Sequence, residues 1–331
     1  GFKTCDSHAL RAAAASEKEE ACMGKYVIKR LLLLIPILLG VSFIIFTIMN
    51  MIPGDVASLV LGDNAPLSAR QELTRELGLD KPFWLRYVDY VWNAVHGNFG
   101  LSYRTRTPVF TEIFSRFPTT MKLAAGAMLL SVAIGVPLGI LSAVKQYSAL
   151  DVINSVTAMF FSSIPAFWLG LLSILLFALK LGWLPSNGAD TMKSFILPIV
   201  TLALPGAAEI LRLTRSTMLE VIRQDYIRTA RAKGASSMVV IWKHALKNAL
   251  LPVITVAGMH FGALLGGSVI TESVFAMPGV GTLAIDAIRS KDTPQVMAAV
   301  LMLAALFCII MLIVDLLYAF IDPRIRSRYS K

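Results

Sequence analysis

The sequence contains little charge for its length. Only 16% of its 331 residues are Asp, Glu, Lys or Arg, whereas 56% are hydrophobic and the mean hydropathy is +0.68. A water-soluble domain keeps roughly 25% charged residues to cover its surface. The composition therefore excludes an ordinary soluble fold and indicates a lipid environment.

Cysteine and histidine are also scarce. The three cysteines are far apart, and Cys308 lies inside an apolar run, so no disulfide framework is implied. The histidines are scattered along the chain, at His8, His96, His244 and His260. We therefore predict neither a disulfide-stabilised fold nor a metal site.

Common catalytic motifs are missing as well. The sequence contains no G-x-x-x-x-G-K-[ST] phosphate-binding loop, no His-Glu-x-x-His, no G-x-S-x-G and no Cys-x-x-Cys. The first absence argues against a P-loop ATP site, and the others argue against common hydrolase and redox sites. We predict no catalytic residue, so the energy for any work would come from a partner.

Long apolar runs are what the sequence has in quantity. A helix needs roughly 20 apolar residues to cross a bilayer. Six segments qualify: Leu31–Met51, Leu123–Val144, Val152–Leu179, Phe195–Leu211, Leu250–Ile270 and Val296–Ile321. We predict an all-α polytopic membrane protein with six transmembrane helices in one domain, residues 23–331. The polar residues 1–22 are interpreted as a non-native or disordered N-terminal extension.

The net charge of +10 fits this topology. Lys and Arg concentrate before the first span, between the fourth and fifth spans, and after the last span. Basic residues in short flanks mark the cytoplasmic side of a membrane protein. We predict that both termini are cytoplasmic, that the basic charge faces the bilayer surface, and that the chain has no nucleic-acid partner.

Two long loops connect the spans. The outer loop, residues 53–120, is predicted to form a small helical cap, with capping-box spacing at Ser68 and a second helix over Pro82–Val95. The inner loop, 216–250, is rich in helix formers and is interrupted at Gly234. This pattern predicts two helices at an angle.

The inner loop has the pattern of a docking surface for a soluble partner. A short helix between two spans can pass force into them if it has small residues for close approach and a break before the next span. The alternative is a loop that is basic only because topology requires it. The docking residues that we select are Asp225, Tyr226, Arg228, Ala230, Arg231 and Gly234.

The inner loop resembles the EAA loop of binding-protein-dependent ABC importers, in the form found in dipeptide, oligopeptide and nickel permeases. In the broad EAA pattern a Glu precedes the two small residues, where this chain has Arg228-Thr-Ala230. Further stretches resemble the same family in the same order: Ile52-Pro-Gly-Asp55, Leu77-Gly-Leu-Asp-Lys-Pro82, Gly97-Asn-Phe-Gly-Leu-Ser102, Glu272-Ser-Val-Phe-Ala-Met-Pro-Gly-Val-Gly281 and Asp322-Pro-Arg-Ile-Arg326. Together these stretches extend along the chain from Met23 to Arg326.

The resemblance implies the type I ABC importer permease fold and the first of two paired permeases in a bacterial inner membrane. The implied partners are a second homologous permease, two ABC ATPases, an extracytoplasmic solute-binding protein and a peptide substrate. The ATPases would bind ATP and Mg²⁺, so this chain itself needs no cofactor. The implied mechanism is alternating access. A nickel or metal-chelate permease is the open alternative, and a membrane-embedded enzyme or a passive channel fits less well.

Three ionisable residues are candidates for the substrate pathway: His260, Glu209 and Glu272. An ionisable side chain inside a membrane span is a functional hypothesis by default, although His260 bonded to a neighbouring carbonyl is an equal alternative. Glu209 lies three residues before Arg212, so an ion pair along one helix face is its other interpretation. Glu272, at the outer end of the fifth span, is either exposed to water or part of an outer gate.

Glycines suggest two further features. The repeat Gly258-x-x-x-Gly262-x-x-x-Gly266 predicts a smooth ridge for helix packing, within the chain or against the second permease. The last outer loop begins with a turn that the resemblance marks as a gate. Its candidate gate residues are Pro278, Gly279 and Gly281.

Overall fold

The computed structural model describes the backbone of residues 3–52, 54–62 and 64–321, and the side chains of residues 27–52, 54–62, 64–266 and 268–317. Within these ranges every regular element is helical, and the only β-type pairing is an isolated bridge between Leu101 and Pro108. The prediction of an all-α fold is confirmed. The stretch Asp322–Arg326 lies outside the described residues.

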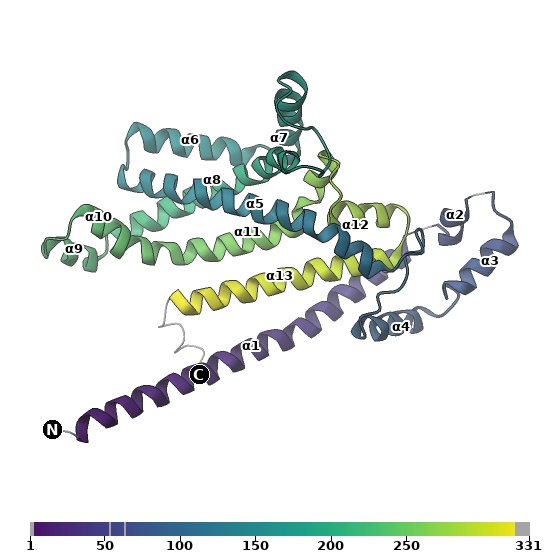
Figure 1. Cartoon of the computed structure of the whole chain (residues 1–331), viewed down its shortest axis with the longest axis horizontal. Coiled ribbons are helices and arrows are strands. Elements are labelled where there is room, and N and C mark those ends of the chain that lie inside the picture. The colour runs from purple at the N-terminus through teal and green to yellow at the C-terminus, as the bar shows by residue number, and fades with distance from the viewer. Residues whose placement is uncertain (1–2, 53, 63, 322–331) are drawn as a thin grey trace.

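Figure 1 shows a bundle of long helices with smaller helices gathered at its two ends. The long helices are α1 (Lys3–Met51), α5 (Val109–Val144), α8 (Ile196–Ile222), α11 (Leu246–Val274) and α13 (Thr293–Ile321). Each contains a segment that is long and apolar enough to cross a membrane. The helix α1 begins at Lys3, so most of the polar residues 1–22 are helical in this structure.

The third predicted span is not a continuous helix. It consists of α6 (Ala149–Ser163) and of α7 (Ala166–Ser173) with the π-helical η1 (Ile174–Lys180), and the two parts meet at 98°. Pro165 causes the break, because proline lacks an N–H and forces Ile164 into an extended conformation with ψ 127°. The predicted span Val152–Leu179 is therefore bent at Pro165 and is not one straight helix. The described chain has five continuous spans, or six if the bent pair counts as one.

The fourth predicted span ended too early. The helix α8 continues beyond Leu211 to Ile222, although Arg212 and Arg215 interrupt the apolar run. Arg215 donates two hydrogen bonds to the carboxylate of Asp151 in α6, from Nε to Oδ1 at 2.6 Å and from Nη2 to Oδ2 at 2.8 Å. Asp151 is only 3% exposed. This bidentate pair joins the inner ends of α6 and α8.

The helix α8 packs very closely on α5. A Cβ on Gly135 of α5 would lie 2.7 Å from the carbonyl oxygen of Ala207, and a Cβ on Gly139 would lie 2.6 Å from Cβ of Thr214. Small residues of this kind let two helix backbones approach within a membrane. The pair α5–α8 is therefore the rigid centre of the bundle.

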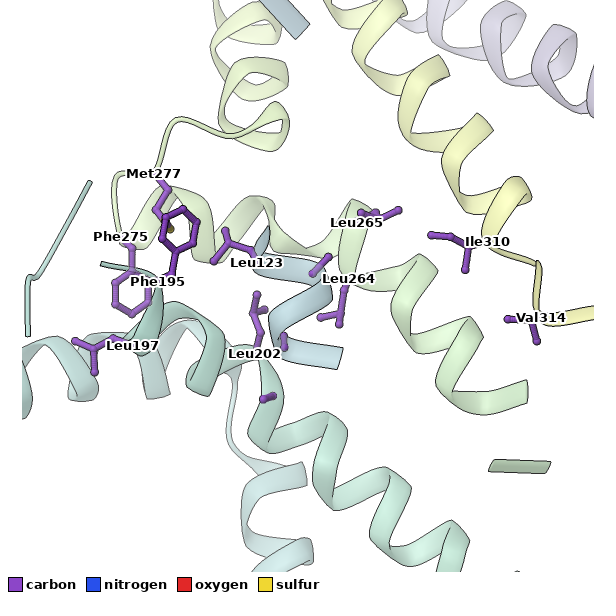
Figure 2. Packing of buried hydrophobic residues seen from close by; sticks show 13 residues of the cluster. Leu123, Phe195, Leu197, Leu202, Leu264, Leu265, Phe275, Met277, Ile310 and Val314 are labelled. Atoms are coloured by element: carbon purple, nitrogen blue, oxygen red, sulfur yellow. The ribbon is translucent and has the colours of Figure 1, made fainter. Parts of the chain in front are cut away.

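The main apolar core joins α5, α8, α11 and α13 (Figure 2). Leu123, Leu202 and Leu265 are central to it and are at most 6% exposed. The loop after α11 contributes Phe275 and Met277, each 1% exposed. The last outer loop is therefore anchored in the core by its own side chains.

The outer cap contains α2 (Val56–Leu61), α3 (Leu67–Glu76) and α4 (Phe83–Val95). The two helices predicted for the cap are present, and α2 is an addition. The predicted capping box at Ser68 is not formed, since α3 begins one residue earlier behind Pro66 and has no side-chain cap. Asp55 caps α2 by accepting hydrogen bonds from the N–H groups of Ala57 and Ser58.

The inner loop contains α9 (Asp225–Ala232), α10 (Ser237–Val239) and the π-helical η3 (Val240–Ala245), which runs directly into α11. Gly234 separates α9 from α10 with φ +84°, a conformation that glycine adopts without strain. The predicted break at this residue is present. Figure 1 shows α9 and α10 at the end of the bundle opposite to the outer cap.

Candidate functional site

His260 and Glu209 face each other between α11 and α8. The distance from Nδ1 of His260 to Oε2 of Glu209 is 3.8 Å, and the two side chains are 20% and 52% exposed. No ion pair joins Glu209 to Arg212 among the described residues, so that interpretation was wrong. The structure brings together two of the three predicted pathway residues, at membrane depth and on an open side of the chain.

Gly206 of α8 makes room for the imidazole ring. A Cβ on this glycine would overlap Nε2 of His260 and would lie 2.8 Å from Oγ of Ser131. The Nε2 atom is buried and has no hydrogen-bond partner among the described residues. The alternative of a ring bonded to a neighbouring carbonyl is therefore not observed there. Nε2 is therefore a buried and unsatisfied polar atom, and it is Nδ1 that faces Glu209.

Glu272 is completely buried, which corrects the expectation that it is exposed to water. Its Oε1 atom accepts hydrogen bonds from the hydroxyl groups of Thr120 at 2.7 Å and Ser268 at 3.0 Å. Its Oε2 atom accepts from the backbone N–H of Thr282 at 3.0 Å. We call Glu272, Thr120, Ser268 and Thr282 the outer node. This arrangement separates Glu272 from the exposed pair of His260 and Glu209.

The predicted gate residues lie directly on the outer node. A Cβ on Gly279 would overlap the carboxylate of Glu272, and a Cβ on Gly281 would lie 2.6 Å from Cγ2 of Val269. Pro278 stands beside them at the start of the same turn, immediately before α12 (Val280–Arg289). The glycines are thus required by close approach to a buried carboxylate, so the segment is more than a plain turn.

A second buried carboxylate, Asp292, was missed by the sequence analysis. Its Oδ2 atom accepts from the hydroxyl of Ser102 and from the N–H of Arg104, the latter at 3.4 Å, and Asp292 is 0% exposed. The preceding Lys291 has φ +52° and donates from Nζ to the carbonyl of Ile52 at 3.1 Å. In the sequence, the only hint of this contact was Ser102, which ends the family-like stretch Gly97-Asn-Phe-Gly-Leu-Ser102. Its partner is 190 residues away.

The predicted docking residues lie on α9 and just beyond it. Asp225, Tyr226, Arg228 and Arg231 are exposed, whereas Ala230 is half-buried and Ile227 is fully buried. Ile227 packs with Met218, Val240 and Ala245 in an apolar cluster that continues into α5, α8 and α11. Asn248 of α11 also donates a 2.7 Å hydrogen bond to the hydroxyl of Tyr226. These contacts connect α9 to three of the spans.

The glycine ridge of α11 has two different surroundings. A Cβ on Gly258 would overlap Val314, and a Cβ on Gly262 would lie 2.5 Å from Cδ2 of Phe307, so both glycines lie against α13. Gly266 has nothing within 4 Å of such an atom. Among the residues that the structure describes, the third glycine of the predicted packing ridge therefore makes no such contact.

Comparison with known proteins gives a consistent result. Residues 135–327 match the family described as the binding-protein-dependent transport system inner membrane component, and residues 23–124 match the N-terminal part of such membrane components. The chain is 42% identical to the dipeptide transport system permease protein DppB of Alkalihalophilus pseudofirmus and 44% identical to the glutathione transport system permease protein GsiC of Escherichia coli (strain K12). Each match covers 92% of this chain and 100% of the relative.

A solved structure shares the fold. The inward-facing methionine ABC transporter MetNI aligns with a TM-score of 0.52 at 22% identity, over 64% of this chain and 97% of that chain. The arrangement of the spans is thus that of an ABC transporter permease. The chain belongs to the family of binding-protein-dependent transport system inner membrane components.

Proposed function

We propose that this chain is one of two pore-forming permease subunits of an ATP-driven importer for short peptides in a bacterial inner membrane. The proposal is supported by two relatives that are matched over their full length and whose names specify dipeptide and glutathione transport. Both kinds of substrate are short peptides with charged ends. Both chain termini would be cytoplasmic, as the positions of Lys and Arg indicate.

The observation that carries the proposal is the exposed pair of Glu209 and His260. A carboxylate that is 52% exposed at membrane depth is costly in lipid and is expected to face a partner or a water-filled path. With a second permease against this side, Glu209 would line the pore and meet the ammonium end of a peptide. His260 would position the carboxylate.

The remaining features support the partners that we propose. Two ABC ATPases would bind ATP and Mg²⁺ and dock on α9, so this chain would hold no nucleotide and perform no hydrolysis. A solute-binding protein would deliver the peptide at the outer cap. Movement of α9 would be coupled through Ile227 to α5, α8 and α11, and the pore would alternate between outward and inward openings.

The decisive experiment is uptake into proteoliposomes that contain the complete importer with its binding protein. A labelled dipeptide, glutathione and nickel are offered separately, with ATP or a non-hydrolysable analogue inside. ATP-dependent uptake of a peptide supports the proposal. Uptake of nickel but of neither peptide would contradict the proposal and would support the alternative, a nickel or metal-chelate permease.

Variants of the paired site sharpen this test. We expect His260→Ala and Glu209→Gln to lower peptide uptake about tenfold, which corresponds to the loss of one hydrogen bond to a charged group. Gly206→Ala should have the same effect, because its methyl group overlaps the imidazole. Glu220→Gln, on the exposed surface of the same helix, is the matched control. Unchanged uptake and substrate range in His260→Ala would exclude this role for the pair.

A further inference from the structure

An apolar cavity of about 450 Å³ lies between α1, α4, the start of α5 and α13. Its walls include Leu38, Ala94, Phe114, Ala298 and Met302. The wall residues of α1 and α13 belong to membrane-crossing helices, and those of α13 fall in the half nearer the outer cap. Phe114 and Val95 at the rim are 51% and 77% exposed, so the cavity communicates with the lipid-facing surface.

A single unsatisfied polar group stands at this cavity. The hydroxyl of Tyr90 is buried and has no hydrogen-bond partner among the described residues. Burial raises the pKa of Tyr90 well above its usual value, so the hydroxyl remains a neutral donor. Ser42, the other polar lining residue, already donates to the carbonyl of Leu39 and bonds to Tyr87, at 2.9 Å each. An isolated buried hydroxyl normally has a partner that fills its site.

A second hollow, of about 370 Å³, adjoins the apolar cavity on the side of the outer loop. Tyr90 and Phe99 line both spaces. The second hollow is polar and contains three basic and two acidic side chains, an excess of one positive charge. These residues are Lys81, Arg86, Arg106, Glu76 and Asp89.

The positive charge in excess is that of Arg86. Lys81 pairs with Asp89 at 3.0 Å, and Arg106 pairs with Glu76 at 3.1 Å. Within the described chain no ion pair includes Arg86, whose guanidinium lies 5.6 Å from the centre of the Phe46 ring. The two hollows together therefore offer an apolar slot, a neutral donor at the junction and one cation that forms no ion pair among the described residues.

We propose that this composite site binds one phospholipid of the outer leaflet whose headgroup carries a net charge of −1. An acyl chain fills the apolar cavity, the Tyr90 hydroxyl donates to an ester carbonyl, and Arg86 binds the phosphate. A peptide fits the apolar slot poorly, because the backbone groups of the peptide would find only one hydrogen-bond partner there. The site is separate from the exposed pair of Glu209 and His260 and is independent of the imported substrate.

The test is native mass spectrometry of the purified importer complex, delipidated and then titrated with dioleoyl-phosphatidylglycerol or dioleoyl-phosphatidylcholine. We expect Ala94→Phe, which fills the cavity, to remove one bound phospholipid and to weaken its binding about tenfold. Val88→Phe is the matched control, because Val88 lies on the same helix, is 60% exposed and does not line the cavity. Ala305→Phe repeats the test from α13 if the first variant fails to assemble.

The headgroup is tested separately. Arg86→Gln should keep the acyl chain but lose the preference for phosphatidylglycerol over phosphatidylcholine, whereas Arg75→Gln, exposed on α3 and outside the hollow, should keep that preference. An equal number of bound phospholipids and equal affinity in the wild type and both cavity-filling variants would overturn the proposal. Coverage of this surface by the second permease would produce that result.

Discussion

Thr120 and Glu272 are 152 residues apart in the sequence, are both fully buried and are joined by a hydrogen bond of 2.7 Å in the outer node. Thr120 also accepts a 2.9 Å hydrogen bond from the backbone N–H of Val280. One hydroxyl thereby connects α5, the end of α11 and the start of α12. Any opening of the outer mouth that moves α12 away from α5 must break these bonds.

We predict that Glu272→Gln loosens the last outer loop. The hydroxyl groups of Thr120 and Ser268 and the N–H of Thr282 all donate to the two carboxylate oxygens. An amide must therefore place its own N–H groups against at least one of these donors. The loss should be about 1–3 kcal/mol. It is measured as faster hydrogen exchange in residues 276–290 and a lower melting temperature of the complex. Glu220→Gln is the exposed control, and equal exchange in both variants would refute a structural role for the node.

The sequence predicted much of the fold because its signals are local. Apolar runs placed the long helices, and Gly234 marked the break between α9 and α10. The misjudged elements depended on context. Pro165 was expected within a span, but its missing N–H and the clash with Ile164 broke the helix. The end of α8 was placed too early, because a distant partner, Asp151, holds Arg215.

The candidate site also combines features that follow from local sequence with features that depend on tertiary contacts. Glu272 was selected as an ionisable residue at the end of a span, and Gly279 and Gly281 were selected through the family resemblance. All three lie in one short stretch of sequence, and the structure places them together. The burial of Glu272 was not predictable, because Thr120 provides it from another helix. Asp292 was missed for the same reason. Sequence spacing identifies residues that meet within a helix or a turn, but not pairs that tertiary packing brings together.

The glycine ridge provides a second prediction. Gly258→Ala should destabilise the subunit by about 1–3 kcal/mol, because its methyl group overlaps Val314 in a tightly packed contact. The methyl group of Gly266→Ala meets no atom of the described residues, so this variant should leave the isolated subunit unchanged or slightly more stable. Melting of the isolated subunit measures both effects. If Gly266→Ala impairs assembly with the second permease but leaves the isolated subunit stable, this part of the ridge is an intersubunit contact.

The cap of α2 gives a prediction for pH. The Ser58 hydroxyl, the N–H groups of Ala57 and Ser58, and the charge of Arg70 together hold the pKa of Asp55 below its usual value of 3.8. The ionised carboxylate therefore stabilises α2 above that value, and this contribution is lost as pH falls through the lower pKa of the folded state. Hydrogen exchange in residues 56–61, corrected for intrinsic rates, should rise as the solution is acidified in that range.

Asn provides the control for Asp55, since it caps helices equally well without a titratable charge. Asp55→Asn should keep α2 protected and remove the pH dependence, whereas Asp55→Ala should cost α2 about 1 kcal/mol relative to Asp55→Asn at every pH. A wild-type protection that does not vary with pH would show that the carboxylate charge contributes nothing to the cap.

The break at Gly234 provides the last prediction, which concerns coupling. Gly234 is exposed and has φ +84°, so a side chain meets no clash there but strains the backbone by about 1 kcal/mol. Gly234→Trp should shift α9 relative to α10 and uncouple ATP hydrolysis from uptake in the assembled importer. Lys233→Trp is the control for the added side-chain volume, because it introduces the same residue at an ordinary φ of −77°. Coupled transport by Gly234→Trp would mean that the geometry of this break does not transmit force, since Ile227 alone would then suffice to join α9 to the spans.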